Sequence, residues 1–199
     1  MNLNYFVGGV NGVGKSTLLD AIAKKSSNFR VVKGSEELMR WLGIPGDYDA
    51  LRALPREKKR VEWVKCLEKL LDDHYGHDLL VDAHYLNMID GVVTEVVGEW
   101  IAWFDAAVLV TAPPAEILKR IEGDRARERG LFRSDESDKL GVLEAYQQQT
   151  RAEFCRITEG DLWDLIPNVV ISHRQDKTSE AVDQFLKFDA QLRQDLAAV

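Results

Sequence analysis

The stretch that decides the fold reads Gly9-Val10-Asn11-Gly12-Val13-Gly14-Lys15-Ser16. It follows a short apolar run, Tyr5-Phe6-Val7, and leads directly into a segment that begins Thr17-Leu18-Leu19. The pattern is G-x-x-x-x-G-K-[ST] in the order strand, glycine loop and helix, which is the context that confirms a phosphate-binding P-loop. The sequence therefore predicts a site for the phosphates of a nucleoside triphosphate, expected to be ATP.

Each residue type in this loop has a physical reason for its place. Glycines let the backbone turn tightly and direct several N–H groups into one concavity that holds an anion. The helix that follows adds unpaired N–H groups and the positive end of its dipole. Lys15 brings a mobile charge to the β- and γ-phosphates, and the Ser16 hydroxyl is a ligand for Mg²⁺. The residues expected to contact the triphosphate are Gly9, Asn11, Gly12, Val13, Gly14, Lys15, Ser16 and Thr17.

Composition limits the class of protein. The 199 residues are 45% hydrophobic and 30% charged, which is typical of one soluble globular domain. A net charge of −7 argues against a nucleic-acid partner, because binding to duplexes depends on neutralising phosphates. Cys66 and Cys155 lie far apart, which favours reduced, buried thiols, and no apolar run approaches membrane-spanning length. We expect a cytoplasmic monomer or small homo-oligomer with no membrane partner.

Apolar runs and helical periodicity alternate along the chain. Strands are expected at 5–7, 29–33, 78–82, 106–111 and 169–171. Helices are expected at 15–26, 34–42, 49–54, 55–73, 92–104, 115–122, 139–158 and 179–192. This order predicts an α/β fold with a parallel sheet covered by helices on both faces. Ligands of such sheets bind beyond the carboxyl ends of the strands.

Polar side chains follow the predicted strand at 78–82. Asp82 ends this strand, where a carboxylate can hold Mg²⁺ directly or through water; the alternative is a cap of the next turn. His84 can contact substrate or satisfy a turn. Arg40 and Arg52 lie in the helical segment before this strand, and either could hold the phosphate of a second substrate or be solvated surface residues.

Arginines gather in and next to the segment 123–137: Arg120, Arg125, Arg127, Arg129 and Arg133. A run of like charges is usually a solvated surface. Here the run follows a strand that should end at the same edge of the sheet as the P-loop. Phosphoryl transfer requires such groups, because bidentate guanidinium donors neutralise the charge on the migrating phosphoryl group.

The predicted helix at 139–158 carries a further arginine. Leu140, Leu143, Gln147, Arg151 and Phe154 fall on one stripe at helical spacing. This stripe places Arg151 on the inward side, where an unpaired charge is costly. We expect either an acidic residue or, preferably, an anionic ligand to pair with it.

Together these motifs resemble the nucleoside monophosphate kinases, and most closely the archaeal-type adenylate kinases. The resemblance extends over nearly the whole chain. It rests on Gly9-x4-Gly14-Lys15-Ser16, Leu80-Val81-Asp82-Ala83-His84, Val108-Leu109-Val110-x-x-Pro113, Ile117-Leu118-x-Arg120, Asp124-x-x-Arg127-x-Arg129, and Tyr146-Gln147 followed by Arg151.

The resemblance implies a P-loop NTPase fold with a five-stranded parallel sheet, a small helical monophosphate-binding insert at 34–77 and an arginine-rich lid at 123–137. In that family the γ-phosphoryl group of MgATP moves to a nucleoside monophosphate, and AMP is the expected acceptor. Lys15 and Ser16 would then hold the triphosphate and Mg²⁺, and Asp82 would order the waters of the metal. The transferring group would be clamped by Arg127, Arg129 and Arg151. Arg120 would contact ATP, and Arg52 would contact the monophosphate.

Two alternatives remain open. The same scaffold could phosphorylate another small metabolite, in which case the insert with Arg40 and Arg52 would bind something other than a nucleotide. A P-loop switch or ATPase module is the other alternative. The sequence lacks an Asn-Lys-x-Asp motif, a Leu-Ser-Gly-Gly signature and an Asp-Glu pair at Asp82, which counts against this last class.

Overall fold

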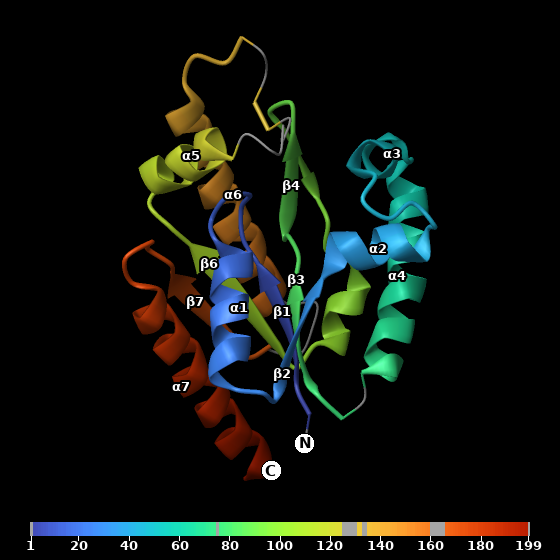
Figure 1. Ribbon diagram of the computed structural model, residues 1–199, viewed down its shortest axis with the longest axis vertical. Helices are drawn as coiled ribbons and strands as arrows, with labels where there is room; N and C mark the ends of the chain where they lie inside the picture. Colours follow the sequence, from blue (N-terminus) through green and yellow to red (C-terminus); the bar gives the residue numbers. More distant parts are fainter. Residues whose placement is uncertain (1, 75, 125–130, 133–134, 160–165, 199) are drawn as a thin grey trace.

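The computed structural model describes residues 2–74, 76–124, 131–132, 135–159 and 166–198. Its centre is a five-stranded parallel sheet with the strand order β2-β3-β1-β6-β7, and helices cover both faces (Figure 1). The strands are β1 (Asn4–Gly8), β2 (Phe29–Lys33), β3 (Asp78–Asp82), β6 (Ala106–Thr111) and β7 (Asn168–Ser172). The predicted fold class is confirmed.

The side chains of β1 alternate between two cores, one on each face of the sheet. Tyr5 and Val7 pack in the core that includes buried residues of α1 and α7, whereas Phe6 packs in the core that includes residues of α4 and α6. The helices are α1 (Lys15–Lys25), α2 (Gly34–Trp41), α3 (Tyr48–Ala53), α4 (Arg56–Asp73), α5 (Pro114–Gly123), α6 (Lys139–Glu159) and α7 (Thr178–Ala197). Among the described helices, none combines the length and apolar character needed to cross a membrane.

The direction of the chain across the sheet reverses at β1. The chain runs from β1 to β2 and β3 on one side, and later to β6 and β7 on the other. In sheets of this kind the ligand site lies at the carboxyl ends of the strands next to such a reversal. The glycine loop follows β1 directly, and Val7 is in register with Asp82 on β3. The topology thus brings the loop and the Asp82 carboxylate to one edge.

The segment 92–104 contradicts the sequence prediction, which had one helix there. The chain instead forms an antiparallel hairpin of β4 (Leu86–Ile89) and β5 (Val92–Glu95), followed by the short 3-10 helix η1 (Glu99–Trp103). Asp90 and Gly91 form the two-residue turn, both with positive φ, 48° and 72°. An Asp-Gly pair before β-branched residues is a hairpin signal, and it outweighs the apolar richness that suggested a helix.

The two cysteines carry free thiols. Cys66 is buried on α4, and Cys155 on α6 is only partly buried, which corrects the expectation of two buried thiols. Burial raises the pKa of the Cys66 thiol to about 11, with a further contribution from Glu37. A thiol in this state is a poor nucleophile near neutral pH, so Cys66 serves the packing of α4.

At the other end of the sheet, an ion-pair network joins α7 to β1 and β3. Asp78 accepts hydrogen bonds from the backbone of Leu3 at 2.8 Å and from Arg193 at 2.7 Å. Arg193 also donates to Asp189 at 2.9 Å, and the Tyr5 hydroxyl donates to the same carboxylate. Burial holds the pKa of the Tyr5 hydroxyl well above its usual range, so it remains a donor. This network fixes α7 on the sheet.

We expect Arg193→Leu to lower the free energy of unfolding by about 2–3 kcal/mol, because its removal leaves the buried Asp78 carboxylate and the partly buried Asp189 carboxylate without this cation. Urea denaturation at neutral pH measures the effect. The control is Lys25→Leu, which removes an ion pair to Asp183 that is about half exposed on both sides and should cost less than about 1 kcal/mol. Equal losses in the two variants would contradict a special role for Arg193.

Candidate active site

The glycine loop turns into α1 through left-handed backbone. Gly12 has φ 78° and Gly14 has φ 98°, and Gly14 occupies the position before the first residue of α1. A Cβ at Gly14 would lie 2.4 Å from the Nδ1 atom of His173, so space as well as conformation requires glycine there. The loop therefore keeps the shape in which successive N–H groups can surround a phosphate.

The Lys15 ammonium lies inside the loop. Its Nζ atom donates to the carbonyls of Gly9 at 3.0 Å and Val10 at 3.4 Å, and it lies 3.9 Å from the Asp82 carboxylate. The residue is only 7% exposed. These contacts compensate the burial of the charge and hold it beside the loop that the motif identifies as the phosphate site.

Ser16 and Asp82 meet at the same edge. The Ser16 hydroxyl donates to Asp82 at 2.7 Å, from the first turn of α1 to the end of β3. A hydroxyl and a carboxylate are hard oxygen ligands, and Mg²⁺ in phosphate sites is held by one or two such groups together with phosphates and water. The pair fits the predicted metal. Thr17, the next residue, is exposed on α1.

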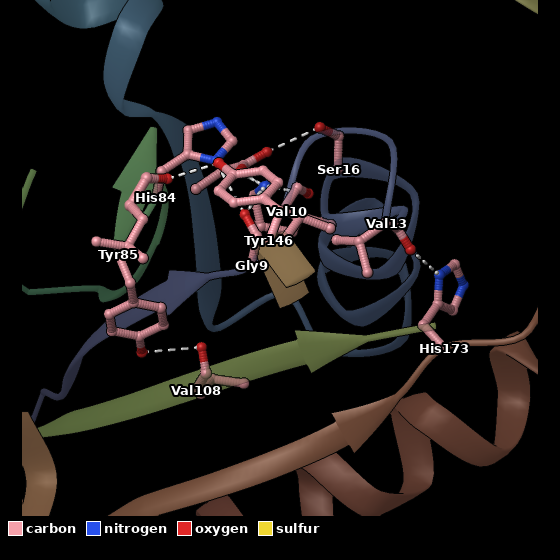
Figure 2. A network of polar contacts seen from close by, with 12 residues as sticks. Gly9, Val10, Val13, Ser16, His84, Tyr85, Val108, Tyr146 and His173 are labelled. Atoms are coloured by element: carbon pink, nitrogen blue, oxygen red, sulfur yellow. Dashed lines mark hydrogen bonds and ion pairs between the residues drawn. The ribbon is translucent and has the colours of Figure 1, made fainter. Parts of the chain in front are cut away.

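His84, which follows β3, lies against the glycine loop. Its Nδ1 atom is 2.9 Å from the Gly9 carbonyl. Because a carbonyl only accepts, this nitrogen must carry the hydrogen. In Figure 2 the glycine loop is flanked by His84 on one side and His173 on the other. This contact gives His84 a structural role beside the glycine loop. A contact of His84 with substrate stays a prediction.

His173 is a site residue that the sequence reasoning missed. It is 2% exposed, its Nδ1 is 3.4 Å from the Val13 carbonyl, and its Nε2 is 3.1 Å from the Thr178 hydroxyl. The neutral ring satisfies both contacts, with Nδ1 donating and Nε2 accepting. Burial lowers the pKa of this imidazole. The available signal was its position directly after β7, at the same edge as the loop.

We expect His173 to make stability depend on pH. Because its pKa in the folded state is lowered, the unfolded chain binds more protons below about pH 6.5, and stability falls as the pH drops through this range. Above that pH the imidazole is neutral in both the folded and the unfolded state, so it no longer makes stability depend on pH. Urea unfolding at pH 7.5 and 5.5 should show a larger loss for the wild type than for His173→Gln. Equal losses would contradict this reading, since all other titrating groups are shared.

Arg120 also holds the loop. It donates to the Val13 carbonyl at 2.7 Å and pairs with Glu116 at 3.1 Å on its own helix. Arg120, which the sequence predicts to contact ATP, thus lies on the outer side of the loop. Arg127 and Arg129, predicted for the clamp, lie outside the described residues, as do Arg125 and Arg133. Their roles stay predictions.

The placement predicted for Arg151 is wrong. Arg151 is exposed, and so is Leu140 at the start of the same predicted stripe. The inward side of α6 carries Leu143, Tyr146, Thr150, Glu153, Phe154 and Ile157. The buried stripe is rotated relative to the predicted one, because Tyr146 and Thr150 face the core; the Tyr146 hydroxyl donates to Leu86 at 2.8 Å. The argument from a buried charge therefore does not hold, and a catalytic role for Arg151 stays a prediction.

Arg40 and Arg52 make contacts within their own helices. Arg40 pairs with Glu37, and Arg52 pairs with Asp49 at 2.7 Å. Both arginines are exposed, and pairs of this kind contribute little to stability. Among the described residues, neither arginine forms a hydrogen bond or an ion pair with the glycine loop. Their role as acceptor contacts stays a prediction.

The side chain of Asn11 is a further candidate contact for a ligand. Among the described residues, the Oδ1 atom of Asn11 is buried and has no hydrogen-bond partner. Buried polar atoms are almost always satisfied, by protein or by water. Rotation of the amide about its last torsion would present its NH₂ group instead, which is the group that suits a phosphate. Asn11 therefore fits the predicted ATP contact.

Comparison with known proteins gives one family match and several relatives. The model of the family described as AAA domain matches residues 6–141. An adenylate kinase of Pyrococcus furiosus is 26% identical over 189 residues, which are 90% of this chain and 91% of that protein. This supports the resemblance to P-loop nucleoside monophosphate kinases that the motifs indicated.

Solved structures share the fold over almost the full length. A gluconokinase from Sinorhizobium meliloti 1021 is 18% identical with a TM-score of 0.54, covering 98% of this chain and 95% of that one. A shikimate kinase from Bacteroides thetaiotaomicron is 14% identical with a TM-score of 0.62, covering 93% and 97%. A shikimate kinase from Acinetobacter baumannii, solved in complex with shikimate, is 13% identical with a TM-score of 0.65, covering 96% and 94%. At these identities the likeness establishes the fold.

Proposed function

This chain belongs to the AAA domain family, and on that premise we propose that it is a phosphotransferase that moves the γ-phosphoryl group of MgATP to a nucleoside monophosphate, with AMP as the first candidate. The observation that carries the proposal is the cluster of Lys15, Ser16 and Asp82 at the loop after β1. The sequence likeness to an adenylate kinase over 90% of the chain supports the choice of acceptor.

The loop residues would bind and orient the triphosphate. Backbone N–H groups of the loop and of the first turn of α1 would surround the phosphates. Lys15, which now donates to the Gly9 and Val10 carbonyls, would turn toward them. Ser16 and Asp82 would hold Mg²⁺, which neutralises phosphate charge when bound. Arg120 and His173 keep the Val13 carbonyl in place on the outer side of the loop.

Transfer itself needs charge neutralisation and exclusion of water. We assign the clamp on the migrating phosphoryl group to Arg127 and Arg129 of the lid segment 123–137, and to Arg151. No covalent intermediate is required, because positioning of the two substrates supplies much of the rate. Closure of the lid would keep water from competing with the acceptor.

The acceptor would lie between the sheet edge and the helical insert 34–77. His84, Arg40 and Arg52 are the candidate contacts from the sequence. A protein of this kind acts on small molecules, and we expect a cytoplasmic monomer or small homo-oligomer that requires no nucleic acid or membrane.

A kinase of another small metabolite is the second candidate. The structures of a gluconokinase and of two shikimate kinases cover more than 90% of this chain, so this scaffold also serves acceptors that are not nucleotides. A P-loop ATPase module without an acceptor is the third. The three candidates predict that ADP formation depends on a nucleoside monophosphate, on another small metabolite, or on no acceptor at all.

A coupled assay for ADP tests the proposal. The purified chain is supplied with ATP and Mg²⁺, and with AMP, the other nucleoside monophosphates, gluconate or shikimate one at a time. ADP formation that requires AMP or another monophosphate is the expected result. Dependence on gluconate or shikimate would favour the second candidate, and ADP formation at one rate with or without any acceptor would overturn phosphotransfer.

A further inference from the structure

Two donors from separate elements meet at one carbonyl of the glycine loop. The Val13 carbonyl accepts from Arg120 of α5 at 2.7 Å and lies 3.4 Å from the Nδ1 atom of His173, which follows β7. The imidazole also lies directly against Gly14, since a Cβ there would be 2.4 Å from its Nδ1 atom and 2.7 Å from its Cε1 atom. Figure 2 shows the contact between Val13 and His173 on the side of the loop away from His84.

The Val13 carbonyl belongs to the same peptide group as the Gly14 N–H. This group is planar and trans, so its carbonyl and its N–H point in opposite directions. A carbonyl that is held on the outer side of the loop therefore directs the N–H to the inner side, where the Lys15 ammonium lies. Within the described part of the chain this N–H donates no hydrogen bond to another residue, so it is available to a phosphate oxygen.

The direction of this N–H depends on contacts from outside the loop. Gly14 has φ 98°, a left-handed conformation that glycine adopts without strain, but glycine also permits many other conformations. Rotation of the Val13–Gly14 peptide would turn the N–H away from the phosphate site. The two donors at the Val13 carbonyl oppose that rotation, because it would break their hydrogen bonds.

His173 is itself held from three sides. Its backbone N–H donates to the Thr111 carbonyl at the end of β6 at 2.7 Å, and its Nε2 atom is 3.1 Å from the hydroxyl of Thr178, the first residue of α7. A hydroxyl that donates to Nε2 places the hydrogen of the neutral ring on Nδ1, the atom that faces Val13. The imidazole is 2% exposed, so the sheet and α7 fix its position.

Arg120 makes the shorter contact with Val13, but it has a second predicted task. Its guanidinium is partly exposed and is the group that the sequence assigns to ATP. A guanidinium that turns toward ATP gives up hydrogen bonds to the loop, whereas the buried imidazole keeps its place. His173 is therefore the donor that can hold the Val13 carbonyl while a nucleotide is bound.

We infer that His173 is a positioning residue for the nucleotide: through the Val13 carbonyl it keeps the Gly14 N–H directed at a phosphate. The inference rests on the proposed function only in requiring a nucleotide on the loop, and it gives His173 no part in the transfer step. The N–H groups of a P-loop hold phosphates that stay on the nucleotide during transfer. The contact therefore stabilises the bound substrate and the transition state alike.

Calorimetric binding of MgADP tests the inference without turnover. His173→Leu removes the donor, and we expect it to bind MgADP about tenfold more weakly than the wild type, because a hydrogen bond to a charged group is lost. His173→Asn should retain most of the affinity, since its amide nitrogen takes the place of Nδ1. In His173→Gln the longer side chain brings the amide to the place of Nε2, so this variant should bind as weakly as His173→Leu.

Kinetics and a stability control separate positioning from a purely structural role. In His173→Leu the KM for ATP should rise about tenfold while kcat stays within a few-fold of the wild type, the pattern expected when uniform binding is lost. Arg193→Leu, which should lose stability at the opposite end of the sheet, should bind MgADP as the wild type does. If urea unfolding shows that His173→Leu is not folded, the comparison of His173→Asn with His173→Gln decides.

Other outcomes would overturn the inference. These are wild-type affinity in His173→Leu or His173→Gln, an equal loss in His173→Asn or Arg193→Leu, a fall in kcat without a rise in KM, or no binding of MgADP by the wild type. The proposed function is judged separately, by ADP formation that requires a nucleoside monophosphate. Such turnover, together with unchanged MgADP binding in His173→Leu, would leave phosphotransfer standing and remove only the role of His173.

Discussion

Replacement of Lys15 by Met should reduce kcat/KM for ATP by about 10²- to 10³-fold, the loss expected when one preorganised donor to a reacting oxyanion is removed. The ammonium that now lies 3.0 Å from the Gly9 carbonyl is the mobile charge of the loop. Methionine keeps the apolar stem and removes a charge that is 7% exposed, so the fold should be retained. Steady-state kinetics and urea unfolding of the same preparation measure both effects.

The matched control for this variant is Lys24→Met on the same helix. Lys24 is exposed in the last turn of α1, away from the loop, and its loss should leave kcat/KM near the wild-type value. If Lys15→Met retained activity within a few-fold of the wild type, or if Lys24→Met lost as much, the loop would not be the site of ATP turnover.

Asp82→Asn should weaken the apparent affinity for Mg²⁺ by about 10- to 100-fold, the range seen when a group that supports a metal site is removed. The amide is isosteric and can still accept from the Ser16 hydroxyl, which now donates to Asp82 at 2.7 Å. The lost carboxylate charge is the change that the experiment isolates. A Mg²⁺ titration of the initial rate at fixed ATP measures the shift.

Asp20→Asn provides the control for this second variant. Asp20 is exposed on α1, so the variant removes one carboxylate charge from the same helix without touching the loop. A Mg²⁺ dependence of Asp82→Asn identical to that of the wild type would show that Asp82 caps the turn after β3, the alternative that the sequence left open.

The sheet and the loop could be predicted because their signals are local. The strands predicted at 29–33 and 78–82 coincide with β2 and β3, and the glycine pattern determines the loop after β1. A strand buried on both faces, such as β3, appears in the sequence as an apolar run. The edge at which Asp82 and the loop meet then follows from the parallel order of the strands.

The hairpin was missed because apolar richness does not distinguish a helix from strands over a short segment. The phase of α6 was missed for a related reason. Leu140 was counted on the inward stripe, but it lies in the first turn of α6 and is 40% exposed, so the stripe began at the wrong residue. Packing of Tyr146 and Thr150 against the core decides the rotation of that helix, and this packing is not encoded in its periodicity alone.

His173 shows where prediction from the sequence stops. It follows a short edge strand and belongs to no motif of its own. The residue becomes visible once the fold places its buried ring 3.4 Å from the Val13 carbonyl of the glycine loop.

The most direct test of phosphotransfer follows the label of [γ-³²P]ATP in the presence of Mg²⁺ and AMP. We expect the label to appear in the β-phosphoryl group of the ADP formed from AMP, with little in inorganic phosphate. Lys15→Met should slow this transfer by the same factor as kcat/KM, about 10²- to 10³-fold. Label that accumulates in inorganic phosphate at the same rate with or without any acceptor would contradict the account and make this chain an ATPase.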